Sequence, residues 1–209
     1  GGNSEWEHFG EDNILDAERT NCNCETCNSY NMLKLSRELF KITHDSKYMD
    51  FYENTYYNSI LSSQNPETGM TTYFQPMATG YFKVYSTEWD KFWCCTGSGM
   101  ESFTKLGDTI YMHDENSLYV NFYQSSVLSW DEKNVTITQE SNIPDGKTAK
   151  FTFKGSTDSD IYFRIPDWIA GTMQITVNGA KYTYQTVNGY AKVSGHRSHG
   201  DVIELTIPS

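Results

Sequence analysis

The sequence predicts an α+β protein with two parts, a helical part over residues 1–115 and an antiparallel β-sandwich over residues 116–209. Two observations favour this fold class. Apolar side chains recur at helical spacing between positions 27 and 60, and apolar and polar residues alternate from Leu118 onward. A chain of 209 residues can bury roughly 70% of the surface that its unfolded form exposes, so a packed core is expected.

The first two helices follow from the spacing of apolar residues. One helix is predicted from Cys27 to Ile42, and the side chains expected to face the core are Met32, Leu33, Leu35, Leu39, Phe40 and Ile42. A second helix is predicted from Tyr48 to about Ile60. It has to end before Pro66, because proline cannot continue a helix.

A long loop and a third, shorter helix come next. The loop runs from Pro66 to about Trp93 and is longer than most connections, which is typical of loops that line a site. Ser98 and Glu101 match the S-x-x-E capping box, which predicts a short helix that starts directly behind Cys95.

The remaining residues alternate between apolar and polar and predict strands. The predicted strands are "LYVNFY", "VTIT", "KFTFK", "IYFRI", "QITVNG" and "VIELTI", separated by turns that are rich in Gly, Asp and Asn. Asn178-Gly179 and Asn188-Gly189 are dipeptides typical of hairpin turns. This pattern predicts an antiparallel β-sandwich.

Charge and composition narrow the classes of partner. The formal net charge of −11 disfavours nucleic acid and anionic membrane surfaces, and no apolar run approaches the roughly 20 residues of a membrane span. Fifteen Tyr residues favour a carbohydrate ligand, because Tyr offers an apolar ring with a polar tip. The chain begins with Gly1 and Gly2 rather than Met, so we expect a piece of a longer protein.

Five cysteines lie in two clusters, Cys22, Cys24 and Cys27 in one and Cys94 and Cys95 in the other. Disulfides between the clusters are one interpretation, and a metal site is the other. Thiolates are favoured near the start of the third helix, where free backbone N–H groups and the positive end of the helix dipole lie.

A zinc site needs about four N, S or O donors. The segment "CNCETC" supplies Glu25 and Cys27, which together with Cys94 and Cys95 complete one candidate shell. Cys22 and Cys24 fall outside this set, and either is available to replace a ligand or to form a disulfide with the other. The spacing differs from that of a zinc ribbon, so spacing alone leaves the disulfide alternative open.

Several segments resemble glycoside hydrolase family 127, the β-L-arabinofuranosidases. They are "GGNSEWEHFG", "ETCNSYNMLKLSRELF", "NSILSSQNPETGM", "FWCCTGSGMES", "LYVNFY", "FRIPDW", "VNG" and "GDVIELTIP", which together span essentially the whole chain. The resemblance implies that the helical part is the C-terminal portion of an α/α-barrel catalytic domain. The family's barrel begins before the motif at Gly1, so we expect the longer parent protein to be the enzyme.

The resemblance also implies a retaining mechanism in which a zinc-bound cysteine attacks the sugar. Cys94 would be the nucleophile, sharing Zn²⁺ with Glu25, Cys27 and Cys95, and Glu7 would be the acid/base. The implied substrate is an arabinose-containing oligosaccharide or polysaccharide, and the implied location of the parent protein is the periplasm or the medium.

The chemistry of these roles leads to two further expectations. A general acid keeps its proton near neutral pH when it is held partly away from water, so we expect this of Glu7. Four aromatic residues in or beside the loop, Tyr73, Phe74, Phe92 and Trp93, either shape a sugar pocket or belong to the core. Two alternative functions remain, a zinc-stabilised carbohydrate-binding or structural module and a glycosidase of the same fold acting on another sugar.

Overall fold

The computed structural model of the chain describes residues 6–12, 14, 19–105 and 107–209. Two compact units make up the chain, and each is described by itself. The first consists of Gly1–Thr43 and Tyr48–Gly107, and the second of His44–Lys47 and Asp108–Ser209. No helix in the described part of the chain is long and apolar enough to cross a lipid bilayer.

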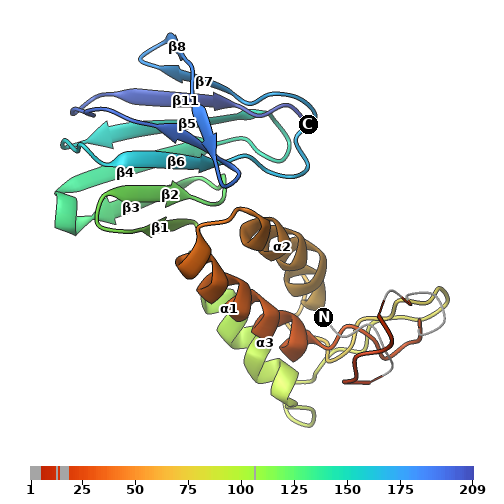
Figure 1. The fold of residues 1–209 in the computed structure, drawn as a ribbon. Coiled ribbons are helices and arrows are strands. Elements are labelled where there is room, and N and C mark those ends of the chain that lie inside the picture. The colour runs from red at the N-terminus through yellow and green to blue at the C-terminus, as the bar shows by residue number, and fades with distance from the viewer. Residues whose placement is uncertain (1–5, 13, 15–18, 106) are drawn as a thin grey trace. The chain divides into compact units, whose positions relative to one another are not determined.

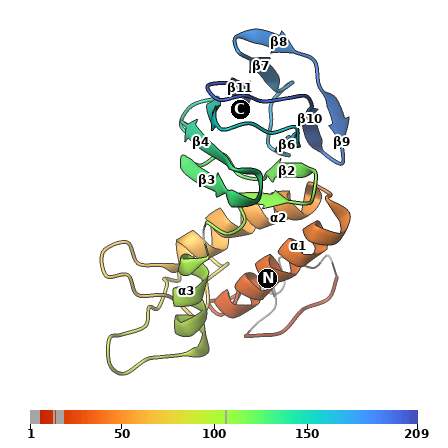
Figure 2. The same ribbon diagram turned by 90° about the vertical axis from the view of Figure 1, so that its left-hand side faces the viewer.

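Helices form the framework of the first unit, as predicted. They are α1 (Thr26–Thr43), α2 (Lys47–Thr55), a π-helical turn (Tyr56–Ile60), a 3-10 turn (Leu61–Ser63) and α3 (Cys94–Thr104). Helices α1 and α3 are in contact and lie side by side in Figure 1, and Figure 2 shows the same helices turned by 90°. Because the described residues of the first unit contain only these helices, the α/α-barrel remains a prediction.

The buried face of α1 differs from the predicted one. Leu33 and Phe40 are buried as expected, but Leu35 and Ile42 are exposed, and small hydroxyl side chains at Thr26, Ser29 and Ser36 are buried instead. Ser59 Oγ donates a hydrogen bond of 2.7 Å to Ser29 Oγ. A hydroxyl is inexpensive to bury when it is hydrogen-bonded, so apolar periodicity alone could not identify this face.

The second unit is a sandwich of two sheets, which Figure 1 shows stacked face to face. One sheet has the order β1-β2-β6-β10-β9 and the other the order β3-β4-β5-β11-β7-β8. The strands are β1 (Tyr111–His113), β2 (Ser117–Val120), β3 (Ser126–Trp130), β4 (Val135–Ser141), β5 (Thr148–Lys154), β6 (Asp160–Arg164), β7 (Gln174–Val177), β8 (Ala180–Tyr182), β9 (Gln185–Val187), β10 (Tyr190–Val193) and β11 (Val202–Thr206).

The predicted sandwich is confirmed, with one correction to its strand directions. Strands β2 and β6 pair in parallel, with Leu118 opposite Ile161, whereas the other named pairs are antiparallel. The segment between β2 and β6 crosses to the other sheet and returns, so these two neighbours enter their sheet in the same direction. Inward side chains of both sheets, including Phe151, Phe163 and Ile203, form one continuous core.

Both predicted hairpin turns are present. Asn178 and Gly179 have φ angles of 52° and 79° and join β7 to β8, while Asn188 and Gly189, with φ angles of 48° and 80°, join β9 to β10. Two successive positive φ angles characterise the type I′ turn, whose twist matches that of the flanking strands.

Asp201 ties two turns of the sandwich together, and its replacement provides a test of pH-dependent stability. Its carboxylate accepts hydrogen bonds from the backbone N–H of Ser198 at 2.8 Å and from the side-chain amide of Asn178 at 2.9 Å. These bonds, the Ser198 bond first, hold the pKa of Asp201 below its ordinary value. The stability they give is therefore present above the unfolded-state pKa and is lost as pH falls through the folded-state pKa.

We expect Asp201→Asn to lower the free energy of unfolding at neutral pH by roughly 1 kcal/mol, as is usual for partly exposed hydrogen bonds to a charged acceptor. The difference from wild type should shrink below about pH 4, where the unfolded carboxyl is protonated. Urea unfolding of both proteins between pH 7 and pH 3 measures this difference in the free energy of unfolding. The matched control is Glu204→Gln on the exposed side of β11, and an equal pH dependence in both variants would contradict the assignment.

Candidate active site

Four of the predicted site residues lie together where α1 and α3 begin. Single ligand atoms of Glu25, Cys27, Cys94 and Cys95 all lie within 4.8 Å of one another. The Cys27 and Cys95 sulfurs are 3.1 Å apart, and those of Cys94 and Cys95 are 4.0 Å apart. Cys95 Sγ lies 3.2 Å from Glu25 Oε1. A group of three sulfurs and one carboxylate is able to bind a metal ion.

The start of α1 fixes the orientation of Glu25. The residue directly precedes the helix, and its Oε2 accepts a 2.6 Å hydrogen bond from the backbone N–H of Asn28. This is the arrangement of a helix N-cap, in which a side-chain oxygen satisfies a free N–H of the first turn. The other oxygen, Oε1, is left to face Cys95.

Helix α3 begins at Cys94 itself, which corrects the predicted start behind Cys95. Trp93 precedes it in an extended conformation, with φ −83° and ψ 170°, and makes no side-chain cap. Ser98 therefore lies inside the helix rather than at its cap, and its hydroxyl is 3.0 Å from the Cys27 sulfur. The two adjacent cysteines occupy the first turn, where free N–H groups and the helix dipole favour thiolates.

Burial distinguishes the four ligands. Cys95 is fully buried and Glu25 is 8% exposed, whereas the Cys94 side chain is exposed. Burial raises the pKa of the Cys27 thiol to about 11, and burial followed by the contact with Cys27 raises the pKa of Cys95 further. A bound cation has to displace these protons, and its affinity is therefore expected to depend on pH.

All five cysteines are free thiols, so the disulfide alternative is not observed. Cys22 and Cys24 do not join the metal-binding group. The Cys24 sulfur instead lies 3.3 Å from the sulfur of Met77. Cys22 lines the cavity described below.

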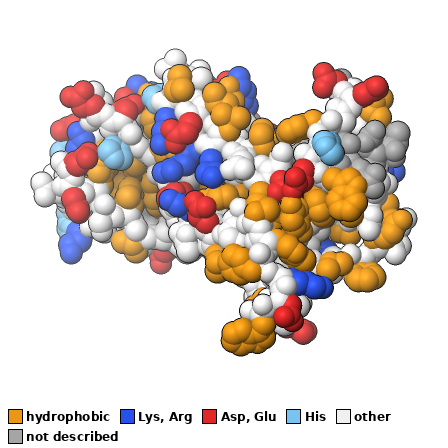
Figure 3. All heavy atoms as spheres, turned by 90° about the horizontal axis from the view of Figure 1, so that it is seen from below, with side chains coloured by type: hydrophobic (Ala, Val, Ile, Leu, Met, Phe, Trp, Pro, Cys, Tyr) orange, Lys and Arg blue, Asp and Glu red, His pale blue; other side chains and the backbone are white. Residues whose placement is uncertain are grey.

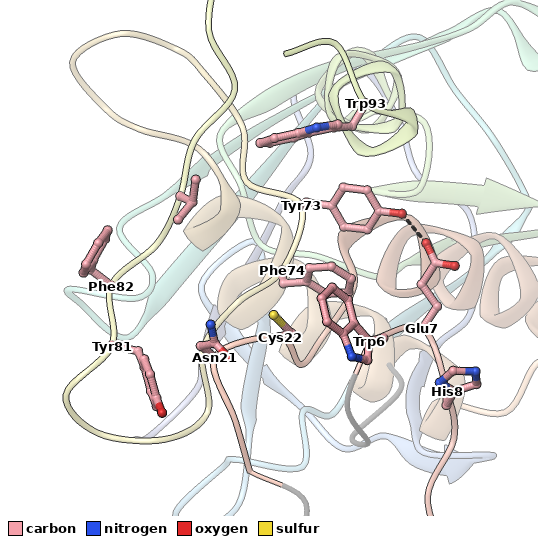
Figure 4. A pocket seen from close by; sticks show the side chains of 11 residues that line it. Trp6, Glu7, His8, Asn21, Cys22, Tyr73, Phe74, Tyr81, Phe82 and Trp93 are labelled. Carbon is pink, nitrogen blue, oxygen red and sulfur yellow. Dashed lines mark hydrogen bonds between the residues drawn. The ribbon is translucent and has the colours of Figure 1, made fainter.

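Glu7 is brought to the cysteine cluster by Tyr73, a contact that the sequence did not predict. The Tyr73 hydroxyl donates a short hydrogen bond to Glu7 Oε1, shown in Figure 4, and lies 3.7 Å from the Cys94 sulfur. These contacts, the bond to Glu7 first, raise the pKa of Tyr73, so the phenol stays protonated. Glu7 itself is exposed, contrary to the expectation that its carboxyl is held away from water.

The position of Tyr73 depends on the first turn of α1. The Thr26 backbone N–H donates to the Tyr73 carbonyl at 3.0 Å, and the Thr26 hydroxyl donates to the Thr72 carbonyl at 2.9 Å. Because Thr26 lies between Glu25 and Cys27, one helical turn presents two ligands and also anchors the loop that carries Tyr73.

A cavity of about 590 Å³ adjoins this cluster. Figure 4 shows its aromatic walls and the Glu7 carboxylate turned towards Tyr73. It is lined by Trp6, Glu7, His8, Asn21, Cys22, Tyr73, Phe74, Tyr81, Phe82, Val84 and Trp93. Three of the four aromatic residues expected at a pocket are present, and Phe92 is exposed outside the lining. Trp6, Tyr81 and Phe82 were not predicted as lining residues. The long, aromatic loop was a signal for Tyr81 and Phe82, whereas Trp6 lies in the N-terminal segment next to Glu7.

Gly99 allows α3 to approach the loop closely, which gives a stability test of the site. A Cβ atom at Gly99 would lie 2.7 Å from Thr71 Cγ2, whereas at Gly97 the nearest atom would be 4.0 Å away, on Phe92. We expect Gly99→Ala to destabilise the chain by about 1–3 kcal/mol through overpacking. Gly97→Ala, in the same helix, should be neutral or stabilising.

Thermal unfolding and metal content of the two glycine variants measure this prediction. Gly99→Ala should melt lower and bind less metal than Gly97→Ala, because Cys94 and Cys95 move with α3. Equal melting temperatures would show that the contact between Gly99 and Thr71 does not hold α3 in place.

Comparison with known proteins assigns the chain to a family. The model of the β-L-arabinofuranosidase GH127 catalytic domain matches residues 1–108, and that of the GH127 middle domain matches residues 117–209. A non-reducing end β-L-arabinofuranosidase from Bifidobacterium longum subsp. longum is 21% identical over 96% of this chain, which spans 33% of the relative's length.

Two solved structures share the fold. A GH127 β-arabinofuranosidase superimposes with a TM-score of 0.85 at 24% identity, covering 98% of this chain and 35% of its own. A GH127 β-L-arabinofuranosidase from Geobacillus stearothermophilus T6 gives a TM-score of 0.83 at 24% identity, covering 100% of this chain and 35% of its own. With a catalytic-domain match over more than half of its residues, the chain belongs to the β-L-arabinofuranosidase family, glycoside hydrolase family 127.

Proposed function

We propose that this chain carries the catalytic centre of a retaining β-L-arabinofuranosidase, with Cys94 as nucleophile and Glu7 as acid/base. One observation carries the proposal: a single phenol oxygen, that of Tyr73, contacts both the Glu7 carboxylate and the exposed sulfur of the cluster. Retaining glycosidases hold the nucleophile and the acid/base close together, roughly 5–5.5 Å apart for a pair of carboxylates, and the shared contact with Tyr73 brings Glu7 and Cys94 near each other.

The proposed cofactor is zinc, held by Glu25, Cys27, Cys95 and Cys94. Two sulfurs on one tetrahedral zinc lie about 3.8 Å apart if each Zn–S bond is about 2.3 Å. The sulfur separations of 3.1 Å and 4.0 Å bracket this value, so the donors fit the ion with small rotations of their side chains. Bound zinc would supply the means to keep the Cys94 sulfur deprotonated at neutral pH.

In the first step the Cys94 sulfur attacks the anomeric carbon of the terminal sugar, and a C–S bond forms as the glycosidic C–O bond breaks. Glu7 gives its proton to the departing oxygen, which leaves as an alcohol. Cys94 suits this role because it is the exposed sulfur of the cluster, whereas Cys95 is buried.

In the second step a water molecule attacks the same carbon and gives a proton to Glu7, while the C–S bond breaks and Cys94 regains its electron pair. Each step inverts the anomeric centre, so the two together retain its configuration. The proposed substrate is an oligosaccharide or polysaccharide that ends in a β-L-arabinofuranosyl residue. We further propose that the parent protein acts in the periplasm or the medium.

Tyr73 is a positioning residue in this proposal, because its hydroxyl orients the Glu7 carboxyl. We expect Tyr73→Phe to lower kcat by roughly 10- to 100-fold, the usual cost of losing a hydrogen bond that orients a reacting group. KM should change little, since the ring that lines the cavity is kept. Steady-state kinetics check this, and Phe74→Tyr is a control that adds a hydroxyl beside the same ring. A Tyr73→Phe variant with unchanged kcat would remove Tyr73 from the mechanism.

The function is tested with a chromogenic β-L-arabinofuranoside, zinc analysis by atomic emission, and NMR of the first-formed sugar. This chain and the longer parent protein should be tested in parallel. The expected result is one zinc per chain, turnover by the parent, and β-arabinose as the first product. An α product would exclude a covalent intermediate, and sugar binding without turnover would indicate a binding module. Release from other glycosides alone would indicate a different sugar specificity.

A further inference from the structure

The cavity beside the cluster contains the proposed acid but not the proposed nucleophile. Glu7, Tyr73 and Trp93 line it, whereas Cys94 is not among the described residues that do. The Cys94 sulfur lies 3.7 Å from the Tyr73 hydroxyl, the same oxygen that contacts Glu7, so the cavity reaches the acid but not the nucleophile. The close-up in Figure 4 shows Glu7 at one end of the cavity and Tyr81 and Phe82 across it.

The position of the acid identifies what such a cavity holds. In a retaining reaction the nucleophile and the acid stand on opposite sides of the scissile bond, and the acid contacts the oxygen of the leaving group. Space on the acid's side is therefore occupied by the leaving group rather than by the sugar that is attacked.

The far wall is a loop that presents two uncovered aromatic rings. Tyr81 is 56% exposed and Phe82 is 80% exposed. They follow Gly80, whose φ of 88° permits the turn, and backbone N–H groups of Met77 and Ala78 anchor the loop to the Thr20 carbonyl. Lys83, on the other side of these two aromatic residues, anchors the loop through a short hydrogen bond from its Nζ to the Ser62 carbonyl.

The chemistry of the wall suits a neutral sugar. Aromatic rings stack on the apolar C–H faces of sugar rings and keep their polar edges free for hydroxyl groups. None of the described lining residues is Lys or Arg, and the carboxyl group of Glu7 is among them. An acidic sugar would find no Lys or Arg counter-ion among these residues and would be repelled by Glu7 when that carboxyl is ionised. Figure 3 shows that exposed hydrophobic side chains gather on the face of the first unit seen there, rather than cationic ones.

We propose that Tyr81 and Phe82 form a binding site for the neutral sugars of the leaving group, so that the protein prefers oligosaccharides to β-L-arabinofuranosides with small leaving groups. This inference rests on the proposed function, since it takes Glu7 as the acid and Cys94 as the nucleophile. Tyr81 and Phe82 are specificity residues in this proposal, because they contact the substrate away from the bond that breaks.

The test compares two substrates, methyl β-L-arabinofuranoside and a trisaccharide of neutral sugars with a terminal β-L-arabinofuranosyl residue, on the zinc-loaded parent protein. Tyr81→Ala and Phe82→Ala should each lower kcat/KM for the trisaccharide by about tenfold, as expected for the loss of one apolar contact. The loss should come mainly from a higher KM, because the contact is made equally in the ground state and the transition state. Methyl glycoside hydrolysis should be unchanged.

Trp89→Ala is the matched control, because Trp89 is 87% exposed on the same loop but does not line the cavity. It should leave both substrates unaffected. Equal losses on both substrates, no loss on the trisaccharide, or the same loss in Trp89→Ala would overturn the inference while leaving the proposed function intact. Failure of the wild-type protein to hydrolyse either substrate would instead refute the proposed function, and this inference with it.

Discussion

Cys94→Ser is expected to lower turnover of a β-L-arabinofuranoside by about 10⁴-fold or more, the usual cost of removing a covalent nucleophile. A serine hydroxyl is not ionised at neutral pH, so it cannot replace the thiolate. The fold should survive, because the Cys94 side chain is exposed and contributes no core packing. Turnover and intact-protein mass after incubation with substrate measure the loss of activity and of the covalent intermediate.

Two further cysteine variants separate a nucleophile from a structural ligand. Cys95→Ser should lose most of its zinc as well as its activity, because Cys95 is fully buried and its sulfur contacts both Glu25 and Cys27. Cys94→Ser should keep a larger share of the metal, since three ligands remain. Cys24→Ser is the matched control, because this cysteine lies outside the cluster. Full activity in Cys94→Ser would exclude a thioglycoside mechanism.

The grouping of Glu25, Cys27, Cys94 and Cys95 could be predicted from the sequence because few residue types suit a zinc site and these four lie in two short segments. Glu25 and Cys27 are presented by the first turn of α1, and Cys94 and Cys95 by the first turn of α3. What spacing alone could not supply is the contact between these turns, which are 70 residues apart in the chain. Spacing could not reveal either that Gly99 lets α3 approach the loop at Thr71, because that approach is visible only in the fold.

Residues whose environment is created by distant partners were predicted least well. Arg164 is fully buried although it lies in a predicted strand, because its Nε donates a 2.7 Å hydrogen bond to the Asn121 carbonyl and its guanidinium lies over the Phe122 ring. The Asn121 side chain in turn accepts a hydrogen bond from the Tyr190 hydroxyl at 2.7 Å. Asn121 lies inside the predicted strand "LYVNFY", whereas β2 ends one residue earlier, at Val120. Alternation predicts which side of a strand faces inward, but not that a polar group there has a partner.

The missed strands have a related cause. Strands β1, β3, β8, β9 and β10 were not predicted. Of these, β8 (Ala180–Tyr182) and β9 (Gln185–Val187) have three residues each, too few for an alternating pattern to be recognised. Their conformation is set by ladder pairing with β7 and β10 rather than by their own composition. Tyr73 was missed as a positioning residue for the same reason, because its role arises from Thr26 on another element.

Glu7→Gln should produce a loss that depends on the leaving group. For an alkyl or sugar leaving group, which departs only when protonated, we expect kcat/KM to fall by about 10²- to 10⁴-fold, the contribution of a general acid. For a nitrophenyl leaving group the first step should be nearly unaffected, because the nitrophenolate departs without a proton. The second step still lacks its base, so the variant should release a burst of nitrophenol followed by slow turnover.

The burst gives this experiment its discriminating power. During the slow phase the sugar should remain attached to Cys94, and intact-protein mass measures that adduct directly. Glu11→Gln is the matched control, because Glu11 is an exposed carboxyl that does not line the cavity, and this variant should behave as wild type.

An equal loss for both leaving groups with no burst would mean that Glu7 only orients Tyr73. Proton transfer would then have to come from another group of the cavity, and the lining includes His8, a residue type that often acts as a general acid.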